Sequence, residues 1–235
     1  MTLNDFILHL FHLYGRRNRL FLPDLVHRIV FLDIAMGDLQ DGVRKGADRA
    51  FLGTMLARVF ARIICVADYF GNLPLVEMLC GKYPQEGCSY CHHLSCDCPE
   101  QRLDYVLESK PSEIQFNWSL KEWCEHFNMV YGERNRSRSI NDVLSRLFKE
   151  IAELLILAMK LPGGFGKAKI KEIEEEFAKE LADALAWTIA AANMLAINLE
   201  VEVTKRYGEV CWNCKICPCD CTLFSMEPVK WPQNN

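Results

Sequence analysis

The chain has 235 residues and a mass of 27.1 kDa; half of its residues are hydrophobic and a quarter are charged. This composition suits a packed core and excludes general disorder. The net charge of −4 and the pI of about 5.9 argue against a broad nucleic-acid surface, because such surfaces are basic. The longest apolar run, near 184–192, is shorter than the roughly 18 residues of a membrane span, so no membrane association is expected. The first residues carry no basic stretch before their apolar positions, so we expect no signal peptide and a cytoplasmic location.

The chain contains two copies of one pattern. Segments 3–19 and 120–136 match at a constant offset of 117, and seven of the 17 aligned positions are identical. The same offset pairs 31–35 (FLDIA) with 148–152 (FKEIA), and two cysteine clusters follow at an offset of 123. An extra Pro-Gly-Gly-Phe-Gly at 162–166 lies where the difference of six residues must fall. These matches predict two tandem units, residues 1–108 and 115–235, joined by a linker at 109–117.

Apolar residues recur at helical spacing in both copies, and no convincing alternating strand is present. We therefore predict an all-α fold in which each copy has four helices and ends in a small metal-held knuckle. The expected helices are 3–14, 24–45, 48–70 and 73–82 in the first copy, and 119–131, 139–161, 168–196 and 199–207 in the second.

Nine of the twelve cysteines lie in the two clusters, at the spacing CxxCx4CxC. Four thiolates within eleven residues are enough to close a tetrahedral Zn²⁺ site, and a closed site is structural. An iron–sulfur cluster is the alternative, because it also takes four cysteines. The expected ligands are Cys88, Cys91, Cys96 and Cys98 in the first copy and Cys211, Cys214, Cys219 and Cys221 in the second.

The remaining cysteines have simpler explanations. Cys217 is a fifth cysteine in the second cluster, and Leu94 stands at its place in the first, so Cys217 is the expected spare. His92 or His93 could replace a cysteine ligand in the first cluster. Cys65, Cys80 and Cys124 lie on apolar helical patterns and are expected in the core.

Four carboxylates of the second copy are spaced for a metal site. Glu150 and Glu153 lie three residues apart on one predicted helix, and Glu180 and Asp183 lie three apart on the next. Residues at i and i+3 share a helix face, so the four side chains converge if the two faces meet. Such a group in an apolar cleft needs a cation, and oxygen ligands favour Mg²⁺ or Mn²⁺. The alternative is an ordinary solvated acidic face, as expected for 172–176.

The motif Glu150-x2-Glu153, 26 residues, Glu180-x2-Asp183 resembles the ExxE…ExxD signature of MazG-like, all-α nucleoside triphosphate pyrophosphohydrolases. The surrounding sequence, 148–207, is similar to that family as well, although Lys149 stands where the family usually has a further glutamate. The resemblance implies that the four acids bind Mg²⁺ and that a water, oriented by Glu150 or Glu153, attacks between the α and β phosphates. The products would be a nucleoside monophosphate and pyrophosphate. Trp187 would border the base or fill the core.

The first copy lacks the acidic set. Asp33, Met36, Thr54 and Ala57 stand at the positions of Glu150, Glu153, Glu180 and Asp183. One acid of four cannot hold Mg²⁺ without help, so the first copy is expected to be a degenerate partner. Because the related enzymes are dimers or tetramers, the resemblance implies an internal pseudo-dimer with one competent site, and a further homodimer is possible.

Each copy also carries the segment YGxRNR. Arginine forks suit phosphate oxygens, and asparagine can read a base edge, so these side chains are candidate substrate contacts. The alternative is a helix C-cap at the glycine followed by a solvated basic loop. The candidate substrate-binding residues are Arg134, Asn135, Arg136, Arg17 and Arg19, together with Lys205, which stands where the family often has a phosphate-binding lysine.

The sequence therefore predicts a Mg²⁺-dependent (or Mn²⁺-dependent) nucleoside triphosphate pyrophosphohydrolase with two structural zinc sites. The expected partner is its nucleotide substrate. The alternative is a non-catalytic nucleotide-binding protein or a zinc-stabilised interaction scaffold. Nucleic-acid binding through the knuckles is a weaker third interpretation, because the knuckles hold few basic residues.

Overall fold

The computed structural model describes residues 1–71, 73–98, 112–161 and 167–222, and for 167–170 the backbone alone. These residues form helices and connecting turns and contain no strand, which confirms the predicted all-α class. The helices are α1 (Leu3–Phe21), α2 (Leu25–Arg44), α3 (Arg49–Ala67) with the 3₁₀ turn η1 (Asp68–Phe70), α4 (Leu75–Lys82), α5 (Glu113–Phe116), α6 (Leu120–Arg136), α7 (Ile140–Lys160), α8 (Lys167–Met194) and α9 (Leu199–Tyr207).

Local sequence determines where these helices begin. Thr2 caps α1 by accepting a hydrogen bond from the Asp5 amide, and the Asp5 side chain accepts one from the Thr2 amide. Ser119 and Glu122 form the same capping box at α6, which is the matching position of the second half. A capping box satisfies two amides that a helix start leaves without partners.

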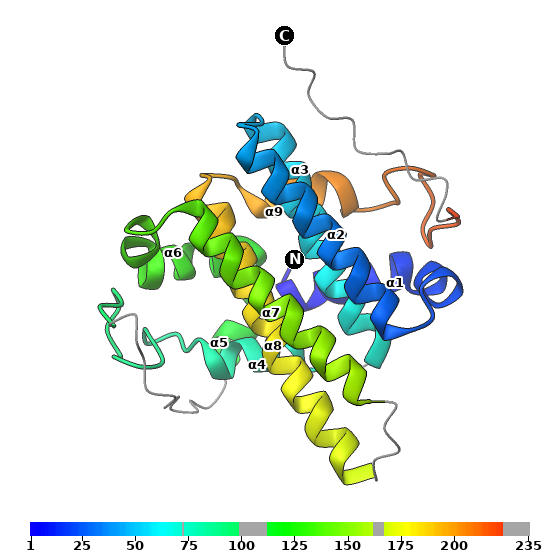
Figure 1. Cartoon of the computed structure of the whole chain (residues 1–235), viewed down its shortest axis with the longest axis horizontal. Helices are drawn as coiled ribbons and strands as arrows, with labels where there is room; N and C mark the ends of the chain where they lie inside the picture. The colour runs from blue at the N-terminus through cyan, green and yellow to red at the C-terminus, as the bar shows by residue number, and fades with distance from the viewer. Residues whose placement is uncertain (72, 99–111, 162–166, 223–235) are drawn as a thin grey trace.

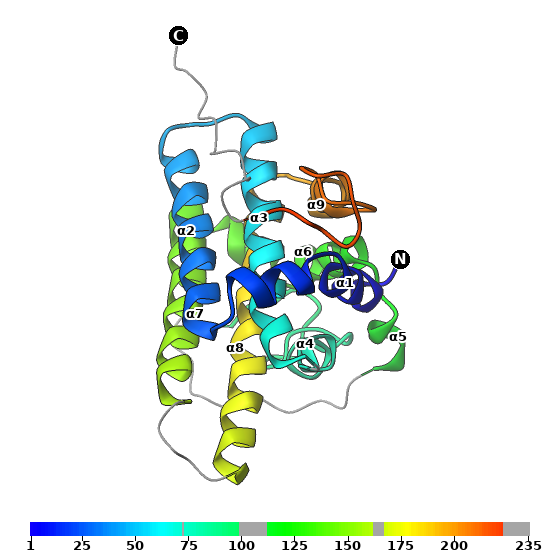
Figure 2. The ribbon, with the colours of Figure 1, turned by 90° about the vertical axis from the view of Figure 1, so that its right-hand side faces the viewer.

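Helices α2, α3, α7 and α8 form the centre of the molecule in two layers. Helices α2 and α7 pack against each other, and α3 and α8 pack together beside them (Figures 1 and 2). Figure 2 shows α1, α4, α6 and α9 on the far side of the α3–α8 layer. The buried core draws on both halves of the chain, for example Leu32 and Phe60 from the first and Leu147 and Leu185 from the second.

The two halves exchange their last helices. Helix α4 of the first half packs on α8 of the second, and α9 of the second half packs on α3 of the first. Tyr83, at the end of α4, meets Tyr131 of α6 edge to face at 6.1 Å and 87°. Tyr207, at the end of α9, meets Tyr14 of α1 at 5.9 Å and 85°. The same contact therefore forms twice, each time between opposite halves.

The cysteine loops take part in the same exchange. The Cys96 amide donates to the Val130 carbonyl on α6 at 2.7 Å, and the Cys219 amide donates to the Leu13 carbonyl on α1 at 2.8 Å. Cys96 and Cys219 differ by 123 positions, and Leu13 and Val130 by 117, which are the two offsets of the repeat. Each cysteine loop is thus bound to the first helix of the other half.

One local prediction was wrong. The YGxRNR segments were given a helix end at the glycine, but α1 continues to Phe21 and α6 to Arg136. Gly15 and Gly132 are buried inside these helices and do not act as C-caps. A Cβ on Gly15 would lie 3.3 Å from Oδ1 of Asp68, which explains a small residue at that position. Packing against the rest of the molecule outweighs the weak helix propensity of glycine.

Helix α3 also bears on the membrane prediction, which rested on uninterrupted apolar runs. The segment Arg49–Phe70 has a mean hydropathy of 1.8 and is long and apolar enough to span a membrane. In this structure, however, 67% of its most apolar window is buried inside the molecule. Among the described residues, the bent pair of Lys171–Met194 and Leu199–Tyr207 passes the same test only if the two are taken together.

Candidate functional site

Three of the four predicted acidic ligands come together. Glu150 and Glu153 lie on α7 and Glu180 lies on α8, and one carboxylate oxygen of each is within 4.8 Å of the others. The i, i+3 spacing placed each pair on one helix face, and the packing of α7 against α8 brings the two faces together. This acidic group could hold a metal ion.

The pKa values of the acidic group are shifted from those of free carboxyl groups. Glu150 is only 7% exposed, and burial, with repulsion from Asp183, raises its pKa to about 8. Burial also raises the pKa of Glu180. Both shifts mean that negative charge is expensive here in the absence of a cation.

Lys149 provides a positive charge at the edge of the group. Its Nζ lies 2.8 Å from Oε1 of Glu153. Burial acts to raise the pKa of Glu153, but hydrogen bonds from Lys149 and Glu150 outweigh it and lower the pKa. The residue that departs from the MazG-like pattern therefore partly neutralises one of the predicted ligands.

Asp183 was predicted to join the acidic group, but its contacts point elsewhere. It accepts a hydrogen bond from the Tyr83 hydroxyl at 2.6 Å and forms an ion pair with Lys82. Both partners lie at the end of α4, in the other half of the chain. Asp183 therefore stands beside Glu150, while Lys82 and Tyr83 hold its carboxylate.

A cleft of about 280 Å³, here called the acidic cleft, opens beside Glu150 and Asp183. It contains three of the predicted substrate contacts, Arg134, Asn135 and Trp187. Trp187 also packs against the hydrophobic core, so both of its predicted roles fit its position. The other lining residues are Lys82, Tyr83, Ser89, Tyr90, Phe127, Tyr131, Arg138, Ala186 and Ala190.

Helical geometry separates the arginines of YGxRNR. Tyr131, Arg134 and Asn135 are three and four residues apart and face the cleft, whereas Arg136 is exposed and bonds to Oδ1 of Asn128 at 3.4 Å. Lys205 is also exposed and lines neither this cleft nor the one described next. The prediction of a basic loop at Arg134–Arg136 is wrong because the segment is helical.

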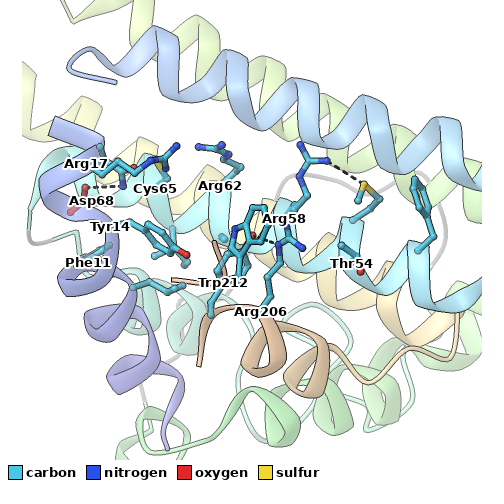
Figure 3. Close-up of a pocket in the computed structure, with 17 residues that line it drawn as sticks. Phe11, Tyr14, Arg17, Thr54, Arg58, Arg62, Cys65, Asp68, Arg206 and Trp212 are labelled. Atoms are coloured by element: carbon cyan, nitrogen blue, oxygen red, sulfur yellow. Dashed lines mark hydrogen bonds between the residues drawn. The ribbon is translucent and has the colours of Figure 1, made fainter. Parts of the chain in front are cut away.

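A second cleft of about 320 Å³, here called the arginine cleft, lies at the matching place of the first half (Figure 3). Arg17 lines this cleft and not the acidic one, and Arg19 is exposed on α1. Neither arginine reaches the acidic group, contrary to expectation. The first-half arginines therefore belong to a different cavity.

Sequence reasoning missed Lys82, Tyr83 and Arg138. A signal was present for the first two, because Lys82-Tyr83 matches Arg206-Tyr207 at an offset of 124, close to that of the cysteines. In the structure both pairs reach a cleft whose other wall belongs to the opposite half. Only the exchange of α4 and α9 places them there.

The first half has no counterpart of the acidic group. Asp33 is exposed, Met36 and Ala57 are buried, and Thr54 lines the arginine cleft. Within the described part of residues 1–98, no group of three glutamates or aspartates comes close enough to hold a metal ion.

Each cysteine cluster brings four sulfurs within 4.8 Å of one another, so both could hold zinc. Sγ of Cys88 lies 3.8 Å from that of Cys98, and Sγ of Cys211 lies 3.8 Å from that of Cys221. A tetrahedral zinc site with Zn–S bonds of about 2.3 Å places its sulfurs about 3.8 Å apart. The spacing therefore suits one ion better than an iron–sulfur cluster, in which the four thiolates are divided between two or four irons.

The two loops share one backbone geometry. The Cys88 amide bonds to the His93 carbonyl at 3.0 Å, and the Cys211 amide bonds to the Ile216 carbonyl at 3.2 Å. His92 and Lys215, again 123 positions apart, both adopt a positive φ, of 58° and 59°. The repeat in sequence is thus a repeat in local structure.

The other cysteines and the histidines also have defined places. Cys217 stands outside the group of four, as predicted. His93 and Asp97 are near Cys91, but both are exposed, and the four cysteines form a complete set without them. Cys65 and Cys80 are buried in the core as expected, and Cys124 packs against it.

The cysteine loops also form walls of the clefts. Ser89 and Tyr90, between the first two ligands of one cluster, line the acidic cleft, and Trp212, at the same place in the other, lines the arginine cleft. Arg134 bonds to Sγ of Cys96 at 3.7 Å. A metal bound to either cluster would therefore support the shape of a cleft.

Comparison with known proteins found no matching family model, no matching curated protein and no matching solved structure.

Proposed function

We propose that this protein is a Mg²⁺-dependent (or Mn²⁺-dependent) pyrophosphohydrolase that cleaves a nucleoside triphosphate, canonical or modified, to the monophosphate and pyrophosphate. The observation that carries the proposal is the group formed by buried Glu150 with the half-buried Glu153 and Glu180, of which Glu150 lines a cleft with cationic and aromatic side chains. The resemblance to MazG-like enzymes supplies the reaction.

The acidic group fits a divalent cation. It offers hard oxygen ligands from two rigid helices, and the raised pKa of Glu150 shows that its charge lacks compensation in the apolar surroundings. When bound, Mg²⁺ would neutralise phosphate oxygens and make a bound water easier to deprotonate. Asp183, next to Glu150, would complete the ligand set if it left Lys82.

The chain's own residues then have separate tasks. Glu150 or Glu153 accepts a hydrogen bond from the attacking water and orients it. Arg134 and Arg138 present guanidinium groups to the phosphate oxygens, where arginine forms paired, charge-assisted hydrogen bonds. Tyr131 and Trp187 offer flat faces to the base.

The exchanged contacts support a tandem, MazG-like pair of units that packs as an internal pseudo-dimer. Both Tyr–Tyr contacts and both amide contacts of the cysteine loops occur twice at the offsets of the repeat. On this proposal the second unit carries the chemistry, and the first contributes Lys82, Tyr83 and a zinc loop. The reduced state that the thiolate clusters need fits a cytoplasmic location.

The test is product analysis with a panel of canonical and modified nucleotides in the presence of Mg²⁺. We expect a nucleoside monophosphate and pyrophosphate in equal amounts. Glu153→Gln should remove this turnover, whereas Asp33→Asn, at the matching place of the first half, should retain most of it. Release of orthophosphate with a nucleoside diphosphate, or equal losses in both variants, would contradict the proposal.

The second candidate is a nucleotide-binding or scaffold protein without catalysis. It is favoured by the two lysines, because Lys149 pairs with Glu153 and Lys82 with Asp183, as in a site that has no resident metal. This alternative predicts nucleotide binding without Mg²⁺-dependent turnover for every member of the panel.

A further inference from the structure

The arginine cleft differs from the acidic cleft in charge. Four arginines line it, namely Arg17, Arg58, Arg62 and Arg206, together with a single carboxylate, Asp68. Asp68 has an ion pair with a fifth arginine, because its Oδ2 lies 3.0 Å from Nη1 of the buried Arg28, and Arg58 pairs with Asp38 from outside the lining at 2.9 Å. The lining of this cleft is therefore strongly cationic.

The arginines come from three helices that the exchange brings together. Arg58 and Arg62 are one turn apart on α3, and Arg17 is buried on α1. Arg206 extends from α9 of the other half, and Figure 3 shows it with Trp212 below Arg58 and Arg62. Like charges four residues apart on a helix destabilise the helix, and guanidinium groups stay charged at any ordinary pH. A site that collects them gains from binding an anion.

The cleft also has an aromatic wall. The guanidinium of Arg206 lies 4.3 Å from the centre of the Trp212 ring, and its Nε bonds to the Tyr207 hydroxyl at 3.2 Å. Tyr14 and Phe11 line the same cavity. The combination of fixed guanidinium groups and aromatic faces suits a ligand with phosphates on one side and a planar ring on the other.

The two clefts are built from matching residues, but only the acidic cleft has the carboxylates that would need a cation. Tyr14, Arg17 and Asn18 correspond to Tyr131, Arg134 and Asn135, and both sets line their clefts. Thr54, at the position that matches Glu180 of the acidic group, lines the arginine cleft, and Arg58 and Arg62 add charge on the same helix face. The acids that would need a cation are gone, and guanidinium groups take the place of the cation.

We propose that the arginine cleft is a second, metal-independent binding site for a nucleoside phosphate. Its ligand is held by Arg17, Arg58, Arg62 and Arg206, with the ring against Trp212. Because residues of both halves form the cleft, the bound ligand ties α9 and its zinc loop to α3. The site binds its ligand without hydrolysing it, and it does not depend on the proposed catalytic function.

The test is calorimetric titration of the full-length, zinc-loaded chain with ATP in a buffer free of Mg²⁺ and of chelator. We expect binding at one site per chain, weaker binding of adenosine, and a loss of affinity with rising salt. Arg58→Gln/Arg62→Gln should raise the Kd at least tenfold. The exposed-residue control Arg146→Gln should leave the Kd within twofold of that of the natural protein.

A second variant guards against loss of folding, since Arg58 also pairs with Asp38 and Arg62 packs on Phe31. Thr54→Glu places a carboxylate one turn from Arg58, a favourable helical pair, so it should fold normally and still raise the Kd at least tenfold. Equal binding of adenosine and ATP would overturn the proposal. So would the absence of binding at millimolar ATP, or binding that Arg134→Ala removes and Thr54→Glu leaves intact. None of these outcomes depends on catalytic turnover.

Discussion

The Tyr83 hydroxyl donates a hydrogen bond of 2.6 Å to Asp183 Oδ1, and the two residues come from opposite halves of the chain. Burial raises the pKa of Tyr83 well above its ordinary value, and the charge of Asp183 raises it further. The hydroxyl therefore keeps its proton at neutral pH and can donate it to the carboxylate. The contact joins the first half to the proposed catalytic helix.

A double-mutant cycle should measure this contact. Hydrogen bonds to charged groups contribute about 1.5–3 kcal/mol, so Tyr83→Phe and Asp183→Ala should show a coupling free energy of about 1.5 kcal/mol or more. The measurement is urea unfolding of both single variants and of the double variant. Tyr69→Phe, at an exposed tyrosine, serves as the control and should leave stability within about 0.5 kcal/mol. Additive effects of the two single variants would mean that the contact is not formed in solution.

Mg²⁺ should stabilise the folded protein through the acidic group. A ligand present at ten times its Kd stabilises by about 1.4 kcal/mol, which corresponds to a rise in Tm of about 3–6 °C for a chain of this size. Glu150→Gln should lose this rise. It should also raise the Tm without Mg²⁺ at pH 8, because it removes a buried carboxylate. Melting curves with MgCl₂ and with NaCl at equal ionic strength provide the comparison, and an equal Mg²⁺ effect on both proteins would count against the site.

The arginines at the end of α6 and in the turn after it should differ in their effect on turnover. Arg134→Ala and Arg138→Ala should raise the KM at least tenfold, because both side chains line the acidic cleft. Arg136→Ala should stay within twofold, because Arg136 is exposed outside it. Zinc content has to be measured beside the kinetics, since Arg134 also contacts Cys96. A larger effect from Arg136→Ala would restore the basic-loop interpretation.

The purified chain should contain two Zn²⁺ and show no visible absorption. Structural zinc contributes roughly 10 kcal/mol or more in small knuckles, so Cys211→Ser should lose one equivalent and unfold at a much lower temperature. Cys217→Ser should keep both equivalents, because Cys217 stands outside the group of four. Elemental analysis decides between the metals, and a brown protein that contains iron would overturn the assignment.

His126 should make the fold sensitive to acid. It is 4% exposed, among Trp118, Trp123 and Phe127, and burial lowers its pKa below the model-peptide value of 6.5. At His126 the unfolded chain therefore binds a proton that the folded chain resists, so the contribution of His126 to stability falls as the pH drops below 6.5, whereas Glu150, with its raised pKa, contributes in the opposite direction. The loss can reach about 1.4 kcal/mol per pH unit for one such group.

Urea midpoints at pH 7.5 and pH 6.0 measure this loss. Compared with the natural protein, His126→Gln should raise the urea midpoint at pH 6.0 relative to that at pH 7.5, whereas His12→Gln, at an exposed histidine, should leave the difference between the midpoints unchanged. If His126→Gln keeps the full difference, another group causes the sensitivity to acid.

The sequence by itself determined the helices, the doubled cysteine loops and the pairing of acids on α7 and α8. These features are local. Helical period, capping residues such as Ser119 and Ser139, and the spacing CxxCx4CxC act within a few residues and need no partner from elsewhere. The repeat also indicated that the two halves would build the same contacts.

Only the tertiary structure decided which half supplies each wall of a cleft. Helices α4 and α9 pack on the opposite half because α8 and α3 offer them apolar faces there, and hydrophobic burial is indifferent to distance along the chain. That exchange brought Lys82 and Tyr83 into contact with Asp183. It also placed Arg206 in the same cleft as Arg58. Helices α1 and α6 continue through the buried Gly15 and Gly132, since burial against neighbouring helices outweighs a propensity loss of about 1 kcal/mol for glycine. The spacing of residues set which side chains share a face, and packing set what that face meets.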